Sequence, residues 1–363
     1  MAKIGISSLG LAIPPHAFLT SALAMLRGAN PEKYAHGIGC EKMSIALDKM
    51  EIVHMASRAA KRALESWPGS LSDIGMLVVG TESSVDESRP LSAFVADELG
   101  LSGAIRSYEV KHACYGGTVA FKQALEWLDS KASSANQAAL VIAADTCYYE
   151  PKSPPEPTQG AGAVAFILTK NPTIASFDIK SYPYSRPVFD FWRPFGTDFP
   201  IVEAKSSVAC YSEALFKTVE QFLKQSPDHT LDDFKALCCH VPFPKMALKG
   251  VKGLFLKLGY TPNALNAYVQ EKVTPYFEWN KVVGNAYTAS LWISVVNALK
   301  SSKPGDKMLC FSYGSGYGAE LLVLDKVLSI PTKAIADFEH DLNTTTLLSA
   351  TDYHAWQEKM GWV

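Results

Sequence analysis

A cysteine at position 114 stands where a side chain could act as a covalent nucleophile. It follows a short predicted strand, residues 107–111, and comes two residues before Gly116-Gly117-Thr118, where a helical segment begins. The N-terminus of a helix has free backbone N–H groups and partial positive charge, which stabilise a thiolate and a developing oxyanion. The alternative is a cysteine that fills space in the core, where this residue type is common. The setting makes Cys114 a candidate nucleophile for acyl transfer.

Two further side chains could move or stabilise charge beside such a nucleophile. Glu82 comes directly after an apolar strand, and strand ends face the ligand-binding crevice of α/β sheets. Shielded from water, a carboxylate there could act as general base and acid near neutral pH. His240 ends another apolar strand, just before Pro242, and could donate a hydrogen bond to a thioester carbonyl. The alternatives are a helix-capping or solvated glutamate and a structural histidine.

Two glycine-containing segments could supply backbone N–H groups to the same chemistry. Gly160-Ala161-Gly162 and Gly314-Ser315-Gly316 each lead into an apolar strand. Turns of this kind suit an oxyanion hole, although each could be an ordinary tight turn. Because a strand and not a helix follows, neither segment is a dinucleotide-binding fingerprint. Their similarity suggests a duplicated α/β unit, with chance as the alternative.

A basic run could bind a phosphorylated ligand. Its members are Lys245, Lys249, Lys252 and Lys257. Lysine ammonium groups at such spacing could hold the phosphates of a nucleotide-tailed ligand such as coenzyme A. A solvated helix face is the alternative interpretation.

The elements that must position these residues alternate between strands and helices. This order predicts a mainly parallel sheet covered on both faces. The tail, residues 330–363, is more polar and less periodic, and we expect a lid, an interface arm or a surface covering there. We expect strands at 4–11, 74–80, 107–111, 138–144, 162–169, 236–241 and 307–311, and helices at 49–67, 91–99, 119–128, 212–225, after 244 and at 288–300.

Composition limits the kind of protein. The chain has 363 residues, of which 48% are hydrophobic and 19% charged, enough for a large core in one or two joined domains. A net charge of -2 does not point to nucleic acid or an anionic membrane. The seven cysteines are an odd number without a CxxC pair, which argues against a disulfide framework or zinc site. Without a long apolar run or a signal peptide, we expect a cytoplasmic protein.

The ordered segments resemble the 3-hydroxy-3-methylglutaryl-CoA (HMG-CoA) synthase family of the thiolase superfamily. The resemblance runs from about residue 4 to residue 325, and it depends on the order of the segments more than on any one of them. The segments are Gly37-Ile38-Gly39, Gly80-Thr81-Glu82-Ser83, Ala113-Cys114-Tyr115, Glu156 to Val164, Asp190-Phe191-Trp192-Arg193-Pro194, His240-Val241-Pro242-Phe243, Val283 to Thr288 and Phe311 to Gly316.

The resemblance implies a fold and an assembly. It implies an α/β thiolase fold with two similar halves, residues 1–170 and 171–363, stacked in five layers in the order αβαβα. It also implies a homodimer.

The resemblance further implies the condensation of acetyl-CoA with acetoacetyl-CoA in the mevalonate route of isoprenoid biosynthesis. Cys114 would be acetylated, and Glu82 would take a proton from the acetyl methyl group and later protonate the new alkoxide. His240 and Asn285 would hold the acetoacetyl group. Backbone N–H groups of Cys114 and Ser315 would hold the acetyl carbonyl, and hydrolysis of the thioester would release HMG-CoA.

Other positions receive supporting roles from the same resemblance. Tyr149 matches a tyrosine near the substrate, Asp145 and Asp190 match carboxylates behind the reacting groups, and Lys245 and Lys249 match coenzyme A contacts. Coenzyme A thioesters are substrates in this scheme, and no metal or redox cofactor is expected.

The sequence departs from the family pattern in places that leave the substrate open. Glu203-Ala204 stands where many members have Asp-Gly, Ala289 replaces a glycine, and the C-terminus is shorter than in many relatives. One alternative is a polyketide β-branching relative that acts on a β-ketoacyl thioester bound to an acyl carrier protein. A decarboxylating ketoacyl synthase is disfavoured by Glu82. An inactive acyl-CoA-binding scaffold is disfavoured by the joint presence of Cys114, Glu82 and His240.

Overall fold

The computed structural model describes residues 3–363, and Met1 and Ala2 lie outside the described residues. A ten-stranded sheet runs through this part of the chain in the order β12-β13-β14-β8-β1-β7-β6-β4-β5, with β9 beside β14. Its strands are β1 (Ile4–Ala12), β4 (Ile74–Gly80), β5 (Arg106–Val110), β6 (Ala138–Cys147), β7 (Gly160–Lys170), β8 (Ala175–Phe177), β9 (Tyr182–Ser185), β12 (Ala236–Cys239), β13 (Met308–Gly314) and β14 (Gly318–Val327).

The same pairing pattern occurs twice in this sheet. In the first half, β4 is parallel to β6, and β6, β7 and β1 follow as antiparallel neighbours. In the second half, β12 is parallel to β13, and β13, β14 and β8 follow as antiparallel neighbours. A helix precedes the second strand of each set: α4 (Gly116–Asp129) before β6 and α9 (Ala289–Lys300) before β13. This duplication is the thiolase-like arrangement that was expected.

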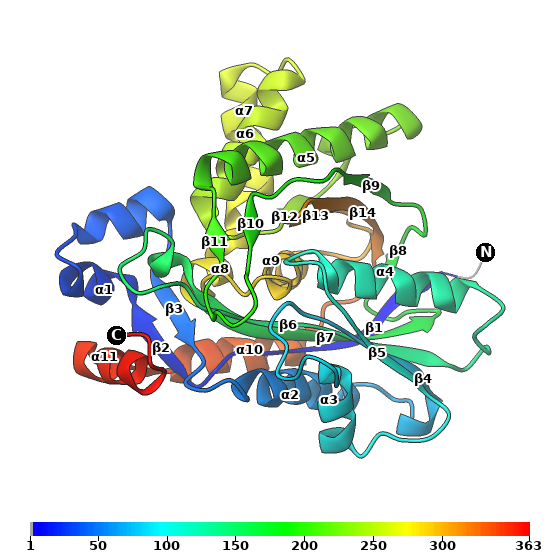
Figure 1. The fold of residues 1–363 in the computed structure, drawn as a ribbon. Helices are drawn as coiled ribbons and strands as arrows, with labels where there is room; N and C mark the ends of the chain where they lie inside the picture. The colour runs from blue at the N-terminus through cyan, green and yellow to red at the C-terminus, as the bar shows by residue number, and fades with distance from the viewer. Residues whose placement is uncertain (1–2) are drawn as a thin grey trace.

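Five layers are visible in Figure 1, where α4 and α9 lie between the two halves of the sheet. The outer face of the C-terminal strands is covered by α5 (Ala204–Gln225), α6 (Pro244–Lys257) and α7 (Pro262–Lys272). The outer face of the N-terminal strands is covered by α2 (Glu51–Glu65) and α3 (Leu91–Leu99). Strands β4 and β6 are buried along their whole length because helices cover both of their faces.

The central layer is a tightly packed aromatic and aliphatic core. Trp292 of α9 packs against Phe121 of α4, with ring centroids 4.4 Å apart, and against Phe166 of β7 at 5.0 Å. These contacts join the middle helices of both halves to one sheet. Strand β8 adds a second connection because it pairs with both β1 and β14. A division at residues 170 and 171 coincides with the end of β7 at Lys170, but as a domain boundary it stays a prediction.

The expectation of a mainly parallel sheet is wrong, because the sheet is mixed. Residues 148–159 return the chain from β6 to β7 without a helical crossover, so these two strands are antiparallel. A tight turn at residues 315–317 does the same between β13 and β14. The apolar runs were identified correctly, but periodicity does not reveal strand direction.

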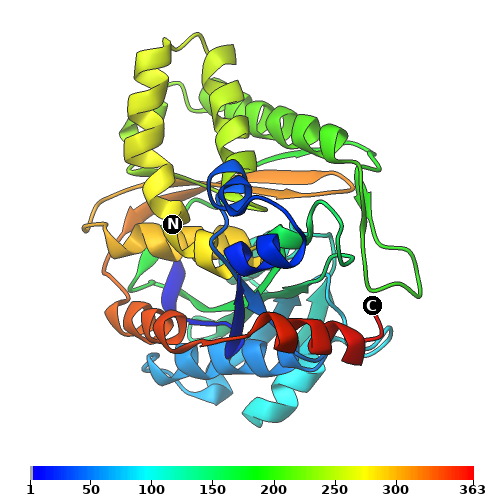
Figure 2. The ribbon, with the colours of Figure 1, turned by 90° about the vertical axis from the view of Figure 1, so that its left-hand side faces the viewer.

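The polar tail is a covering layer on the N-terminal half, one of the three expected forms (Figure 2). It contains α10 (Thr332–Thr344), β15 (Thr346–Leu347) and α11 (Ala350–Lys359). Several other elements without a sequence-based prediction are short: β2 (His16–Leu19), α1 (Thr20–Leu26), β3 (Lys42–Ile45), β10 (Phe191–Trp192), β11 (Ile201–Val202) and α8 (Glu278–Val283). Within residues 3–363, no helix combines the length and apolarity that a bilayer span requires.

Candidate active site

Cys114 lies in a constrained loop just before α4, as the sequence predicted. The preceding residue, Ala113, has a φ of +40°, which is strained for a residue other than glycine. The turn between β13 and β14 presses against this loop: a Cβ on Gly314 would lie 2.6 Å from the Cβ of Tyr115 and 2.7 Å from the carbonyl oxygen of His112. The C-terminal half therefore fixes the loop that holds the nucleophile, and glycine is required at 314.

Glu82 is the hydrogen-bond partner of the candidate nucleophile. The Cys114 Sγ donates to Glu82 Oε1 across 3.5 Å. Burial raises the pKa of Glu82, and the nearby Asp145 carboxylate raises it further, while the guanidinium of Arg193 opposes both. Burial and the Glu82 carboxylate also raise the pKa of the Cys114 thiol well above its usual range. A proton can thus be exchanged between two groups whose charged forms are both disfavoured.

Asp145 positions the segment that bears Glu82. Its Oδ1 accepts hydrogen bonds from Thr81 Oγ1 at 2.8 Å, the Glu82 N–H at 2.8 Å and Ser83 Oγ at 2.7 Å. Its Oδ2 accepts from the Thr288 N–H at 3.0 Å. Burial raises the pKa of Asp145, and these hydrogen bonds lower it. A buried carboxylate at the end of β6 therefore connects the Glu82 segment to the start of α9.

His240 follows β12 and is fixed at both ends of its backbone. Its N–H donates to the Phe311 carbonyl oxygen at 2.8 Å, and its own carbonyl accepts from the Tyr211 hydroxyl at 2.7 Å. Burial lowers the pKa of His240 to about 3, so the imidazole is neutral at physiological pH. Among residues 3–363 its buried Nδ1 has no hydrogen-bond partner. A neutral imidazole held in this way can donate one hydrogen bond to a substrate carbonyl.

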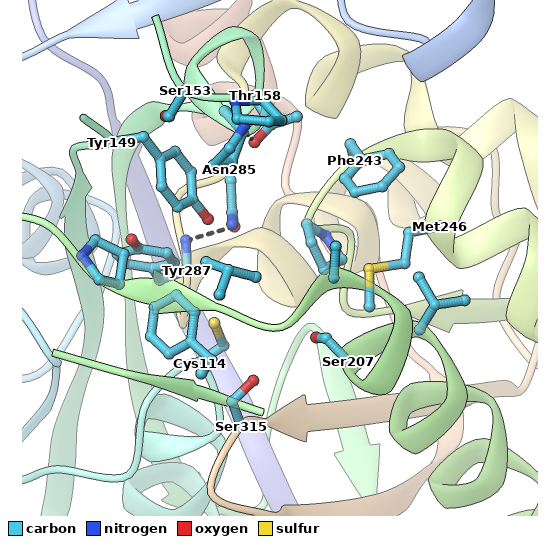
Figure 3. A pocket seen from close by; sticks show the side chains of 18 of the residues that line it. Cys114, Tyr149, Ser153, Thr158, Ser207, Phe243, Met246, Asn285, Tyr287 and Ser315 are labelled. Carbon is cyan, nitrogen blue, oxygen red and sulfur yellow. Dashed lines mark hydrogen bonds between the residues drawn. The ribbon is translucent and has the colours of Figure 1, made fainter. Parts of the chain in front are cut away.

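One cavity of about 470 Å³ brings most of the predicted site residues together (Figure 3). Cys114, Tyr149, His240, Asn285 and Ser315 all line it. Glu82 reaches it through its contact with Cys114. The wall is otherwise largely apolar, with Ile38, Pro154, Pro155, Phe191, Pro200, Ile201, Val202, Ala204, Val208, Pro242, Phe243 and Met246 among its members.

Within residues 3–363, the hydrogen bonds of Asn285 leave its amide nitrogen free for a ligand. Its Oδ1 accepts from the Tyr287 N–H at 3.0 Å, drawn as a dashed line in Figure 3, and from Ser290 Oγ at 3.3 Å. Both contacts orient the amide, so its NH₂ group is the donor available to the cavity. Gly284 before it has a φ of +82°, and a Cβ there would lie 2.1 Å from the Gln159 carbonyl oxygen. Glycine is therefore required beside Asn285.

Asp190 holds the turn that contains Ser315. Its Oδ2 accepts from the Tyr313 hydroxyl at 3.1 Å and from Ser315 Oγ at 3.2 Å, and its Oδ1 accepts from the Gly316 N–H at 3.4 Å. Gly316 has a φ of +103°, as a tight turn here demands. The expected turn at 314–316 is therefore present, and a buried carboxylate stabilises it.

The other glycine segment is not a turn. Gly160 and Gly162 lie within β7, opposite Cys147 and Asp145 of β6. They therefore do not form the loop of free N–H groups that the sequence suggested. Glycine is needed at 160 for another reason: a Cβ there would lie 2.5 Å from the Val283 carbonyl oxygen.

The two lysines expected to contact coenzyme A lie at the edge of the site. Lys245 and Lys249 are exposed on α6, while Phe243 and Met246 at the start of that helix line the cavity. Neither lysine forms a salt bridge within residues 3–363. Their place beside the cavity wall is compatible with a phosphate contact, which stays a prediction.

Sequence reasoning gave no role to two residues of the site. The Arg193 Nη1 donates to the Glu82 carbonyl oxygen at 3.1 Å, and its Nη2 lies 3.6 Å from Glu82 Oε2. Tyr287 is buried in the cavity wall with a φ of +40°, and its hydroxyl has no partner among the described residues. Both occur in segments that carried the family resemblance, but nothing in their spacing revealed these contacts.

Known proteins resemble this chain over almost its whole length. A family model for the N-terminal part of hydroxymethylglutaryl-coenzyme A synthase matches residues 1–173, and one for the C-terminal part matches 177–261 and 260–361. The hydroxymethylglutaryl-CoA synthase of Enterococcus faecalis is 31% identical over 354 residues, which are 96% of this chain and 88% of that protein. The Haloferax volcanii synthase is 30% identical, over 92% of this chain and 86% of that protein.

Solved structures agree with the sequence matches. The MvaS protein in complex with 3-hydroxy-3-methylglutaryl coenzyme A superimposes with a TM-score of 0.91 at 31% identity, covering 98% of this chain and 92% of that one. The HMG synthase of the curacin biosynthetic pathway gives a TM-score of 0.90 at 25% identity, covering 99% of this chain and 89% of that one. With a duplicated thiolase-like fold and two family models that span both halves, this chain belongs to the hydroxymethylglutaryl-coenzyme A synthase family of acyltransferases.

Proposed function

We propose that this chain condenses acetyl-CoA with acetoacetyl-CoA to give HMG-CoA, as in the mevalonate route. The observation that supports this most directly is the part-buried contact of 3.5 Å between the Cys114 sulfur and the Glu82 carboxylate. A thiol thus lies beside a carboxyl group, and His240 lines the same cavity as the sulfur.

Acetylation of Cys114 is the first step. The thiol attacks the carbonyl carbon of acetyl-CoA and its proton passes to Glu82. Glu82 then gives this proton to the sulfur of coenzyme A, which leaves as a thiol, and the carboxylate is restored for the next step. Backbone N–H groups of Cys114 and Ser315 are the proposed donors to the carbonyl oxygen, since both residues line the cavity and Ser315 is held in its turn by Asp190. Preorganised donors of this kind typically supply about 3–4 kcal/mol of transition-state stabilisation each.

Carbon–carbon bond formation follows on the acetylated cysteine. The thioester keeps the acetyl methyl protons comparatively acidic, and Glu82 removes one of them. The enolate carbon attacks the ketone carbon of acetoacetyl-CoA, and Glu82 returns the proton to the new alkoxide. His240 and the Asn285 amide donate hydrogen bonds to the acceptor, and water then cleaves the Cys114 thioester. Burial raises the pKa of Glu82, which suits a group that must give up the proton it has accepted.

Intact-protein mass measurement tests this sequence of steps. Incubation with acetyl-CoA should add one acetyl mass to the protein, and Cys114→Ser should abolish the addition. Glu82→Ala should still become acetylated, more slowly because the thiol loses its acceptor, but should not form HMG-CoA; loss of a general base typically costs about 10²–10⁴-fold. Normal condensation by Glu82→Ala would show that another group is the base.

The acceptor distinguishes the main proposal from its closest alternative. A related HMG synthase of the curacin pathway has been solved with an acetyl donor acyl carrier protein, at 26% identity to this chain. The higher identity of 31% to the MvaS complex favours free coenzyme A thioesters. Chasing the acetylated protein with acetoacetyl-CoA or with carrier-bound acetoacetate separates the two, and faster consumption of the carrier-bound form would favour the polyketide role.

Three further features belong to the proposal. Lys245 and Lys249 would bind the phosphates of coenzyme A, because they are exposed beside the cavity wall. Two chains would form a homodimer in the cytoplasm. The reaction would need no metal or redox cofactor, since thiol, carboxyl, imidazole and amide groups suffice for each step.

A further inference from the structure

We propose that Arg193 is a positioning residue that keeps Glu82 able to ionise in a site that otherwise disfavours its charge. The inference rests on the proposed role of Glu82 as the general base. Its first support is geometric: Arg193 Nη1 donates to the Glu82 carbonyl oxygen at 3.1 Å, and Nη2 lies 3.6 Å from Glu82 Oε2.

The form of this contact matters as much as its presence. A bidentate guanidinium–carboxylate pair, with two bonds of about 2.8 Å, would hold the carboxylate ionised and oppose its protonation. Here the guanidinium is fixed by a backbone carbonyl, and the carboxylate oxygen is farther away. The charge of Arg193 therefore favours the anion without locking it, so that Glu82 can both accept and return a proton.

The groups around Glu82 leave Arg193 as the cation in closest contact. From β6 comes Asp145, whose four hydrogen bonds stabilise its own negative charge and whose field opposes ionisation of Glu82. Lys111 favours ionisation of Glu82 less than Arg193 does. The titratable and charged groups that face Glu82 are Lys111, Cys114, Asp145, Cys147, Arg193 and Tyr287.

The hairpin formed by β10 and β11 presents Arg193 to the site. Arg193 directly follows β10, whose Phe191 pairs with Val202 of β11 and packs edge-on against Tyr287 at 6.0 Å. Phe191 and Val202 line the cavity. The element that brings the cation to Glu82 therefore also forms part of one wall of the cavity.

The test is the pH dependence of condensation in acetylated enzyme supplied with acetoacetyl-CoA. Arg193→Met removes the positive charge. The part of the pH–rate profile that reports ionisation of Glu82 should then move to higher pH by about one unit, and the rate at a given pH on that part should fall about tenfold. Arg193→Lys keeps the charge and should restore most of the wild-type profile. Arg186→Met is the matched control, because Arg186 forms an exposed pair with Glu213 and should leave the profile unchanged.

The pH profiles of the Arg193 variants can contradict the proposed role of this residue in two ways. The inference would be overturned if the pH–rate profile of Arg193→Met were the same as that of the wild type. It would also be overturned if Arg193→Lys showed the same shift of the profile as Arg193→Met. If Arg193→Met does not fold, Arg193→Gln provides a second neutral variant, and acetylation of Cys114 by mass shows that the site is formed. Normal condensation by Glu82→Gln would refute the role of Glu82 as the general base, and a wild type that does not form HMG-CoA would refute the proposed function. An inactive Glu82→Gln together with an unshifted pH profile of Arg193→Met would refute only the role of Arg193.

Discussion

At the scale of single residues, the site disfavours charge on all three of its central groups. Burial raises the pKa of Glu82 and of Cys114 and lowers the pKa of His240. The sequence suggested a thiolate stabilised by the N-terminus of α4. Such a helix end contributes about 1 kcal/mol, less than the cost of removing an ion from water, so burial prevails in the resting site. The reaction then depends on direct proton transfer from Cys114 to Glu82.

The neutral state of His240 has a consequence for stability. Its folded pKa is about 3 against an ordinary value of 6.5, so between these values the unfolded chain binds a proton that the folded chain does not. The free energy of unfolding should therefore fall as pH decreases from about 6.5 towards about 3.

Comparison of the wild type with His240→Asn isolates the contribution of His240 to the pH dependence of the free energy of unfolding. Urea unfolding at several pH values should show a smaller acid-induced loss of stability in His240→Asn than in the wild type, by up to several kcal/mol at the lowest pH. His354→Asn serves as the control, because His354 is exposed on α11 and its substitution should not change the slope. Parallel curves for the wild type and His240→Asn would contradict the assignment of a neutral, buried imidazole.

At the scale of elements, long apolar segments were predictable and short paired ones were not. The expected strand at 74–80 and helix at 91–99 agree with β4 and α3, because each has a continuous apolar or amphipathic pattern bounded by Gly or Pro. The hairpin of β10 and β11 has two residues in each strand, and its pairing depends on distant packing. Local sequence therefore missed the element that brings Arg193 to the site.

The loop of the same hairpin, between β10 and β11, is held by contacts of Asp198 and Phe199 that we call the latch. Asp198 accepts a hydrogen bond from Lys49 Nζ at 2.6 Å and one from Trp362 Nε1 at 2.9 Å. The Trp362 ring packs against Phe199 at 5.0 Å, and Figure 2 shows the C-terminal end of the chain beside this hairpin. Loosening the latch should admit water to the acetylated cysteine.

Asp198→Ala should therefore increase wasteful hydrolysis. We expect a severalfold higher rate of coenzyme A release without HMG-CoA formation, with a loss of stability of about 1 kcal/mol or less, because the ion pair is partly exposed. Glu98→Ala removes a comparable surface pairing with Lys61 and His54 and should leave hydrolysis unchanged. Equal hydrolysis in both variants would show that the latch does not exclude water.

At the scale of the whole molecule, the site exists only where the two halves meet. Glu82 and Cys114 come from the first half, and His240, Asn285 and Ser315 come from the second. The sequence alone identified Glu82, Cys114, His240 and the turn that contains Ser315 as candidates by their place at a strand end or turn, whereas Asn285 was named only through the family resemblance. Which candidates share a cavity could not be derived from spacing, because that depends on how β8 and the two middle helices join the halves; the family resemblance supplied the grouping.

The C-terminal layer also reaches the site through buried polar contacts. Glu156, in the segment between β6 and β7, forms an ion pair with Arg27 at 2.7 Å and accepts from the Tyr353 hydroxyl at 3.2 Å. The same hydroxyl accepts from Gln159 Nε2 at 2.6 Å, and Gln159 Oε1 accepts from the Tyr149 N–H at 3.3 Å. A continuous chain of hydrogen bonds thus connects α11 to a residue of the cavity wall.

Tyr353→Phe should show whether this connection positions Tyr149. The change leaves Gln159 without an acceptor, which typically costs about 1–3 kcal/mol, and should reduce condensation several-fold while Cys114 still becomes acetylated. Trp356→Phe is the matched control, because Trp356 packs in the same cluster, its Nε1 has no hydrogen-bond partner among residues 3–363, and its substitution should cost stability alone. If Tyr353 acts through Tyr149, adding Tyr353→Phe to Tyr149→Phe should cause little further loss of rate. Additive losses in that double variant, or an equal loss in Trp356→Phe, would mean that α11 contributes to folding but not to the geometry of the cavity.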